Sequence, residues 1–299
     1  MTQTFAGICP LTHLGVLRAQ GADAVQFIHS QLTQDFVLLD AGHARLAAFC
    51  NAKGRMQASF IGLKPAPDTV LLVCSRDLLE RTLKRLSMFV LRAKCKLTDA
   101  SADFQLLGLA GAAVPNDLPT APWSMQHSDG AYTIALYPAQ DQARALWLAP
   151  VDCPPPSGPA LDLDTWLWSE VMAGVATVSA AVFEQFVPQM LNYESVGGVS
   201  FKKGCYPGQE VVARSQFRGT LKRRAYVVRA DGPLSAGSEV FAQGDDEQPV
   251  GMVVQAAPAP EGSWCAIVSM QIQASSQPLH VAGTPLQLLP LPYPLLEDI

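Results

Sequence analysis

Residues 202–223 read KKGCYPGQEVVARSQFRGTLKR, and this stretch decides more about the protein than any other part of the sequence. Pro207 and Gly208 stand directly before a run of helix formers, Gln209 to Gln216. Proline is tolerated in the first turn of a helix because its missing N–H would have no partner there. The stretch therefore predicts a loop that leads into a short helix.

The predicted loop carries one thiol, Cys205, close to Lys202 and Lys203. A thiol that lies before a helix N-terminus and beside ammonium groups is in a setting that favours the thiolate. The alternative is a small buried side chain, since a lone cysteine is more often part of a core. We expect Cys205 to be functional and near the surface, so that replacing Cys205 or Lys203 leaves the fold intact. We expect the remaining cysteines to be structural: Cys9, Cys50, Cys74, Cys95, Cys153 and Cys265.

The same stretch carries a resemblance to a known family. The string Lys203-Gly204-Cys205-Tyr206, followed by Gly208-Gln209-Glu210, Arg214 and Lys222-Arg223, resembles the signature of the YgfZ-type folate-binding proteins. These are relatives of the glycine-cleavage aminomethyltransferase and act in iron–sulfur cluster maintenance. Further matching pieces follow the order of the family: Gln31-Leu32-Thr33-Gln34-Asp35, Asn51-Ala52-Lys53-Gly54-Arg55, Pro188-Gln189 with Asn192, and Val199-Ser200-Phe201.

The resemblance implies an α+β fold shaped as a three-part cloverleaf. Two mixed α/β lobes with antiparallel sheets would be joined by a small C-terminal β-barrel around a central hole that holds tetrahydrofolate. It divides the chain into a folate-binding region of two interleaved lobes, residues 1–221, and the barrel, residues 222–299. It also implies a role in the assembly or repair of iron–sulfur enzymes, including support of tRNA modification.

Composition agrees with a folded protein of the cytoplasm. The 299 residues are 49% hydrophobic and 16% charged, which is ample for cores and argues against disorder. Seven cysteines without framework spacing are typical of a reducing compartment. Residues 1–17 contain no Lys or Arg, and the apolar run 171–183 is too short to span a bilayer, so we expect neither a leader nor a membrane segment.

Charge is unevenly distributed. The net charge is −5, yet residues 200–229 hold eight basic residues and one acid. A basic stripe on an acidic protein favours a local anionic ligand, although a solvated face is an equal alternative. We expect no stable binding of nucleic acid by the protein as a whole.

Periodicity predicts helices over residues 21–32, 76–90, 139–148 and 161–174, in addition to the one at 209–216. Strands are predicted over 46–50, 56–63, 69–75, 94–98, 104–109, 123–127 and 131–137. Residues 150–159 hold five prolines and read as a stiff connector. Beyond Lys222 only strand patterns remain, at 225–228, 250–254 and 265–270, and residues 285–294 read as an extended tail on another domain.

A reduced pterin has an edge of N–H donors that a carboxylate can meet at two points, and an aromatic body suited to stacking. Folate's glutamate tail is anionic and favours Lys or Arg. Glu210, Tyr206 and the basic stripe offer all three, although Glu210 and Arg214 one turn apart could instead form a plain ion pair. With the residues that the resemblance adds, the predicted folate site comprises Lys53, Gln189, Asn192, Tyr206, Gly208, Gln209, Glu210, Arg214 and Arg223, beside the functional pair Cys205 and Lys203.

Two departures argue against aminomethyl transfer. Aminomethyltransferases carry an acidic pair at the stretch that here reads Gly54-Arg55-Met56-Gln57, and a Glu directly before an Ala-Gly pair to hold the pterin. In this chain Met172 precedes Ala173-Gly174, and Glu170 lies about 200° away around the helix, so we expect Glu170 to face away. Pterin recognition would then fall to Glu210, Gln189 or Asn192. No spacing typical of a metal site occurs.

The sequence thus favours a tetrahydrofolate-binding accessory protein for iron–sulfur client proteins, with Cys205 as its functional thiol. One alternative is a folate-dependent one-carbon transferase, which needs a catalytic acid that the motifs lack. The other is a non-enzymatic module that docks RNA or protein through the basic stripe.

Overall fold

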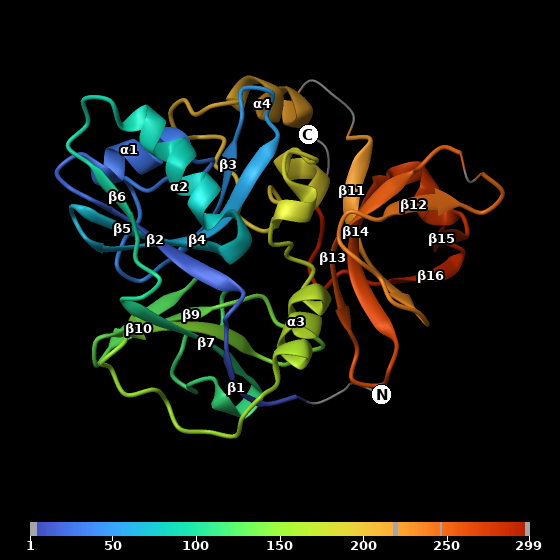
Figure 1. The fold of residues 1–299 in the computed structure, drawn as a ribbon, viewed down its shortest axis with the longest axis horizontal. Coiled ribbons are helices and arrows are strands. Elements are labelled where there is room, and N and C mark those ends of the chain that lie inside the picture. Colours follow the sequence, from blue (N-terminus) through green and yellow to red (C-terminus); the bar gives the residue numbers. More distant parts are fainter. Residues whose placement is uncertain (1–4, 218–220, 246, 297–299) are drawn as a thin grey trace.

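Two five-stranded sheets and a closed barrel make up the protein in the computed structural model, which describes residues 5–217, 221–245 and 247–296 (Figure 1). This architecture confirms the predicted α+β fold class. Within the described residues, no helix combines the length and the apolar character that crossing a bilayer requires.

The first lobe is an antiparallel sheet with the strand order β3-β4-β5-β2-β6. Helices α1 (Ala24–Gln31) and α2 (Arg76–Val90) pack on it, because Leu78, Leu79 and Leu86 of α2 recur at helical spacing and join the sheet's buried side chains. The bounds of its strands are β2 Leu14–Gln20, β3 Arg45–Cys50, β4 Met56–Ala66, β5 Thr69–Ser75 and β6 Lys96–Asp99.

The second lobe is an antiparallel sheet with the order β1-β7-β10-β9-β8. Its strands are β1 Gly7–Pro10, β7 Phe104–Ala110, β8 Met125–Ser128, β9 Ala131–Ala135 and β10 Arg144–Pro150. The helix predicted over residues 139–148 is wrong, since a tight turn at 139–142 leads into β10. The run of helix-forming Ala and Leu is buried on both faces between β7 and β9, and burial there outweighs helix propensity.

The barrel closes in the order β11-β14-β13-β12-β15-β16. Its strands are β11 Arg223–Ala230, β12 Glu239–Ala242, β13 Gly251–Pro258, β14 Trp264–Gln271, β15 Leu279–Val281 and β16 Thr284–Leu289. The predicted tail therefore begins as a barrel strand. Only its second half lies on the rest of the protein, where Tyr293 Oη donates to the carbonyl of Gly174 at 2.6 Å. The division into two domains at residue 221 stays a prediction.

Helix α3 (Leu163–Met172) lies where the lobes and the barrel meet (Figure 1). Asp162 begins it by accepting from Thr165 N at 2.8 Å, and Gly174 follows its end with a φ of +68°, so α3 lies within the predicted range 161–174. Helix α4 (Gln209–Phe217) confirms the helix predicted over 209–216. Short 3-10 turns occupy Gly111–Ala113, Ala180–Val182, Pro188–Leu191 and Ile272–Ser276.

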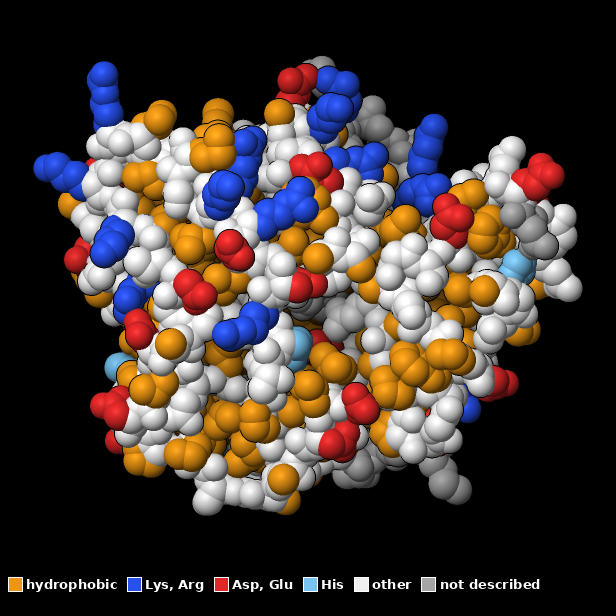
Figure 2. Space-filling view, viewed as in Figure 1, with side chains coloured by type: hydrophobic (Ala, Val, Ile, Leu, Met, Phe, Trp, Pro, Cys, Tyr) orange, Lys and Arg blue, Asp and Glu red, His pale blue; other side chains and the backbone are white. Residues whose placement is uncertain are grey.

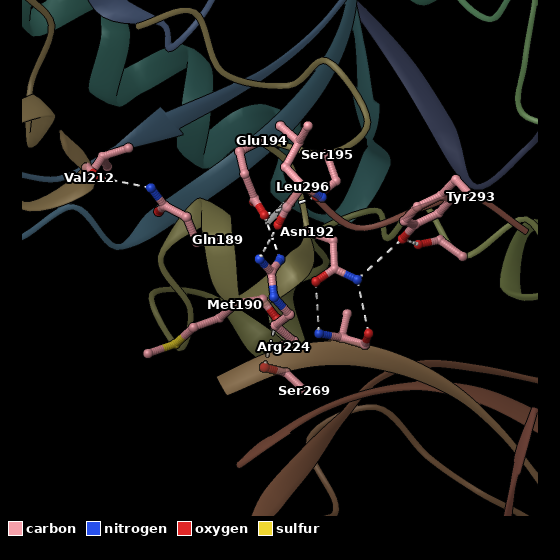
Figure 3. A network of polar contacts seen from close by, with 12 residues as sticks. Gln189, Met190, Asn192, Glu194, Ser195, Val212, Arg224, Ser269, Tyr293 and Leu296 are labelled. Carbon is pink, nitrogen blue, oxygen red and sulfur yellow. Dashed lines mark hydrogen bonds and ion pairs between the residues drawn. The ribbon is translucent and has the colours of Figure 1, made fainter. Parts of the chain in front are cut away.

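Asn192 joins the lobes to the barrel (Figure 3). It is fully buried and ends the turn Pro188–Leu191 with a φ of +58°, in the left-handed region. Its Nδ2 donates to Ala225 O at 2.9 Å and to Tyr293 Oη at 3.4 Å, while its Oδ1 accepts from Ala225 N at 3.2 Å. One side chain thus pairs both backbone groups of a barrel residue. Beside it Arg224 forms a buried ion pair with Glu194.

We predict that Asn192→Ala lowers the free energy of unfolding by roughly 2–5 kcal/mol. The change leaves the buried N–H and C=O of Ala225 unpaired, at about 1–3 kcal/mol each, and places Ala in a left-handed conformation. Urea unfolding against the exposed control Asn116→Ala measures the difference. Equal stabilities of the two variants would mean that this contact does not hold the barrel.

Candidate functional site

A cavity lies between the two sheets and α3. The empty space between its lining atoms is about 640 Å³ and is partly open to solvent. The part of it that the centre of a water molecule can reach is only about 60 Å³, so the cavity is narrow. The aromatic side chains of Trp123, Tyr137 and Trp166 line it, together with aliphatic residues such as Leu146. A narrow slot with aromatic walls suits a flat ring.

Helix α3 presents Trp166, Glu170 and Ala173 to this cavity. These positions are four and then three residues apart, so they share one face of the helix. The expectation that Glu170 faces away is therefore wrong. Glu170 and Met172 do lie on different sides of α3, as expected. The side that faces the cavity is the one that carries Trp166 and Glu170, and Met172 does not line the cavity.

The side chain of Glu170 is only 13% exposed, and its carboxylate accepts hydrogen bonds from three parts of the protein. Its Oε1 accepts from Trp166 Nε1 at 2.9 Å and lies 3.3 Å from His13 Nε2, and its Oε2 accepts from Gln255 Nε2 at 2.9 Å. Burial raises the pKa of Glu170, but the hydrogen bond and charge of His13 and the charge of Arg144 outweigh it, and the pKa lies below its usual value. The carboxylate is thus held ionised, and two oxygens with four acceptor positions leave one for a further donor.

Arg144, at the start of β10, is the second charged group of the cavity and lacks a full set of partners. Its Nη1 donates to Tyr137 O at 3.4 Å and its guanidinium lies 4.5 Å from the centre of the Trp166 ring. Nε and Nη2 are buried without a hydrogen-bond partner. Burial lowers the pKa of Arg144 to about 10, against the opposing charge of Glu170. Unpaired donors inside a cavity call for an acceptor that the chain itself does not supply.

The predicted pair Lys203 and Cys205 lies in a loop outside this cavity. Lys203 is only 7% exposed and points inward, where Nζ donates to the carbonyls of His29 and Leu32 at the end of α1. Its ammonium lies 4.8 Å from the centre of the Tyr206 ring. Burial lowers the pKa of Lys203 to about 8, opposed by the charges of Asp35 and Cys205. The expected surface position is confirmed for Cys205 and wrong for Lys203, because Lys203 caps a helix C-terminus.

Cys205 is the single exposed cysteine among the seven, all of which lie in the described ranges. Burial raises the pKa of Cys9 to about 11 and the pKa values of Cys50 and Cys74 to about 12. His29 lies beside the loop, with its Nε2 3.9 Å from the position that a Cβ on Gly204 would take. Burial and the charge of Lys203 lower the pKa of His29, while Asp35 at 3.2 Å opposes them. The exposed thiol therefore lies near a cluster of titratable groups.

The loop is held by close contact between two backbone segments. Gly208 has a φ of +80°, and a Cβ there would lie 2.4 Å from Asn51 O and 2.7 Å from Gly54 Cα. Only glycine fits, so the start of α4 rests on the turn that carries the exposed Lys53. Gln209 N donates to Tyr206 O at 3.2 Å, which closes the turn into the helix.

The remaining predicted residues lie apart from each other. Glu210 and Arg214 form an exposed ion pair at 2.7 Å, the simple alternative that the sequence left open. Gln189 is buried and donates to Val212 O at 2.7 Å. Arg223 donates to Val250 O at 2.9 Å in a cleft that it shares with Arg55. None of the eleven predicted site residues, all of them described by the structure, lines the central cavity.

Sequence reasoning missed the charged and aromatic residues of the cavity. His13, Tyr137 and Arg144 lie in stretches without a motif, and nothing in the sequence signals that they meet. Trp166 and Glu170 had a usable signal, their spacing of four residues on one helix. Within the three described ranges, no group of His, Cys, Asp and Glu side chains is placed to hold a metal ion.

We predict that the free energy of unfolding rises between pH 8 and 10.5 because of Lys203. Its pKa is about 8 when folded, against an ordinary value of 10.5, so in this window the unfolded chain binds the proton more tightly and stability increases with pH. Urea unfolding of wild type and Lys203→Met at pH 7.5 and pH 9.5 isolates the contribution. The idea fails if both proteins change equally between the two pH values.

Comparison with known proteins gives matches over nearly the whole chain. Residues 1–120 match the GCVT N-terminal domain family. A protein of Sodalis glossinidius named tRNA-modifying protein YgfZ is 32% identical over 93% of this chain and 90% of its own length. A protein of the same name from Serratia proteamaculans is 30% identical over 93% of this chain and 89% of its own.

Among solved structures, the glycine cleavage system aminomethyltransferase T of Bartonella henselae has a TM-score of 0.67 at 16% identity, over 99% of this chain and 88% of that one. This likeness shows that the fold is that of the aminomethyltransferases. The extent and level of the sequence identities place the chain in a narrower group, and it belongs to the YgfZ family.

Proposed function

We propose that the protein binds a reduced folate in its central cavity and supports iron–sulfur enzymes that modify tRNA, with Cys205 as its functional thiol. The observation that carries the folate assignment is the buried guanidinium of Arg144, whose Nε and Nη2 are unpartnered in a slot with aromatic walls. The names of the relatives support the link to tRNA modification.

The chemistry of the lining fits a pterin. Arg144 would donate to the acceptor atoms of the ring, and the open acceptor position of Glu170 would take one of the ring's N–H groups. Trp166 and Tyr137 offer faces and edges against which a flat ring packs. Bound tetrahydrofolate would supply a carrier for one-carbon groups, and these residues would bind and orient it.

The alternative of one-carbon transfer has less support. A catalytic acid or base needs a carboxylate that is free to exchange a proton. Glu170 is the one carboxylate among the residues that line the cavity, and three hydrogen bonds and a lowered pKa hold it ionised. The arrangement therefore favours binding over turnover.

Cys205 lies on the outside of the protein, where a client protein can reach it. A thiol is the group through which a protein exchanges disulfides or ligates an iron–sulfur cluster transiently. Its exposure, together with the resemblance of the surrounding signature, supports a role for Cys205 at the surface while the folate lies inside.

We predict that Arg144→Met weakens tetrahydrofolate binding roughly 10- to 100-fold, the range expected when hydrogen bonds from a charged donor are lost. Met replaces the aliphatic part of the side chain and removes a buried charge, so the variant is expected to fold. Isothermal titration calorimetry measures the affinity, with the exposed Arg229→Met as control. If Glu210→Gln weakened tetrahydrofolate binding to this extent and Arg144→Met did not, the pterin would be bound at α4 instead of in the cavity.

We predict that Cys205→Ala leaves the melting temperature unchanged within about 2 °C, because the side chain is exposed. The variant is expected to fail to restore iron–sulfur enzyme activity in a bacterial strain that lacks its own family member. Cys153→Ala, which removes a half-buried thiol elsewhere, serves as the matched control. Full rescue by Cys205→Ala would rule out a chemical role for the thiol and leave folate binding as a separate question.

A further inference from the structure

A second hollow lies beside helix α2 and shares no lining residue with the central cavity. A water centre can occupy about 390 Å³ of it, several times the room in the central cavity. Three cations of α2 line it, Arg81, Lys84 and Arg85. Because they are three and four residues apart, they lie on one face of the helix and repel one another. We call this space the α2 hollow.

No direct ion pair holds the three cations of the α2 hollow in the described part of the chain. Within the residues that the structure describes, none of the three cations has a carboxylate oxygen within 4 Å, although Glu80 lies one turn before Lys84. Figure 2 shows Lys and Arg side chains over this part of the surface. Clustered and uncompensated cations around a concave surface attract an anion.

The floor of the α2 hollow is apolar. Phe49 and Phe183 line it, and Met88 at the rim is 60% exposed. The guanidinium of Arg81 lies 3.5 Å from the centre of the Phe183 ring, so its plane is already stacked on one side. A flat ring placed on the other side of this guanidinium would continue the stack.

A buried hydroxyl gives an independent sign of a missing partner. Thr82 is 2% exposed, lines the same hollow, and its Oγ1 has no hydrogen-bond partner. A threonine hydroxyl in a helix commonly donates to a carbonyl of the preceding turn. A buried hydroxyl without a partner costs stability, so its retention here needs an explanation.

One carboxylate also lines the α2 hollow. Glu184 has a φ of +60°, and its Oε1 accepts from Gln57 Nε2 at 2.6 Å. Its remaining acceptor positions would repel an anion placed next to them but would accept from an amino group. The hollow therefore combines a cationic side, a stacking surface, a hydroxyl and an acceptor.

We propose that the α2 hollow binds a nucleotide, with the phosphate on Arg81, Lys84 and Arg85 and the base over the Arg81–Phe183 stack. Thr82 Oγ1 bonds to the phosphate or the ribose, and Glu184 accepts from the amino group of the base. The same chemistry is offered by a free nucleotide and by one nucleotide of an RNA strand.

Calorimetry on the full-length protein tests the proposal with adenosine monophosphate as probe, against adenosine and inorganic phosphate. We expect the nucleotide to bind at least 10-fold more tightly than either half. The double variant Lys84→Ala, Arg85→Ala is expected to lose at least 10-fold in affinity. Both side chains are exposed, so the variant keeps its fold, and the exposed Lys96→Ala of the same lobe is the matched control.

The variant Thr82→Val tests whether the α2 hollow is a specific binding site or only a basic surface. The two side chains have nearly the same shape, and replacing an unpartnered buried hydroxyl does not lower stability. We expect a 3- to 10-fold loss of nucleotide affinity at an unchanged or higher melting temperature. An unchanged affinity in Thr82→Val, or in the double variant, overturns the proposal, as does a wild-type protein that binds neither adenosine monophosphate nor a ten-residue oligoadenylate.

The oligoadenylate identifies the source of the nucleotide. Tighter binding of the oligomer than of the monophosphate, lost in Thr82→Val, supports the site with an RNA strand as its ligand. Equal or weaker binding of the oligomer supports the site with a free nucleotide.

Discussion

The buried carboxylate of Glu170 is the point at which the three parts of the protein are joined. His13 approaches it from the turn between β1 and β2, which belong to different sheets, while Trp166 lies on α3 and Gln255 on the barrel strand β13. A buried charge is costly unless it is paired and hydrogen-bonded. Each part must therefore keep its position for the charge to remain satisfied, and the walls of the central cavity are fixed by this requirement.

A second set of hydrogen bonds connects α4 and the barrel to the end of α3. Gln189 ties α4 to the turn Pro188–Leu191, Asn192 at the end of that turn holds the barrel, and Tyr293 reaches from there to Gly174 after α3. The signature residues Gln189 and Asn192 thus position elements around the cavity, and Gln189 Nε2 and both amide atoms of Asn192 are committed to these contacts. This explains why residues that mark the family most clearly do not line its central cavity.

The fold could be predicted well because its signals are local or belong to the family. Pro207 and Gly208 predict the start of α4, the helical periodicity over residues 76–90 predicts α2, and the strand patterns after Lys222 predict the barrel. The error at residues 139–148 arose because a central strand buried on both faces has no alternation, and its Ala and Leu residues favour a helix when read alone.

The site could be predicted only in part, since it depends on contacts between distant segments. Lys203 was expected at the surface because it stands in a loop that leads into a helix, but the end of α1, more than 170 residues earlier, supplies the carbonyls to which it binds. No sequence pattern marks Arg144 as a site residue. Its unpaired donors are seen only in the folded protein, once β10 and α3 are packed. Such orphaned groups become visible in three dimensions alone.

A crystal structure of the protein with bound tetrahydrofolate tests the central claim most directly. We predict the pterin ring in the slot of Trp166 and Tyr137, with Arg144 Nε or Nη2 within hydrogen-bond distance of a ring acceptor and Glu170 accepting from a ring N–H. A pterin held at α4 by Glu210, with the slot filled by water and Arg144 unchanged, would contradict it.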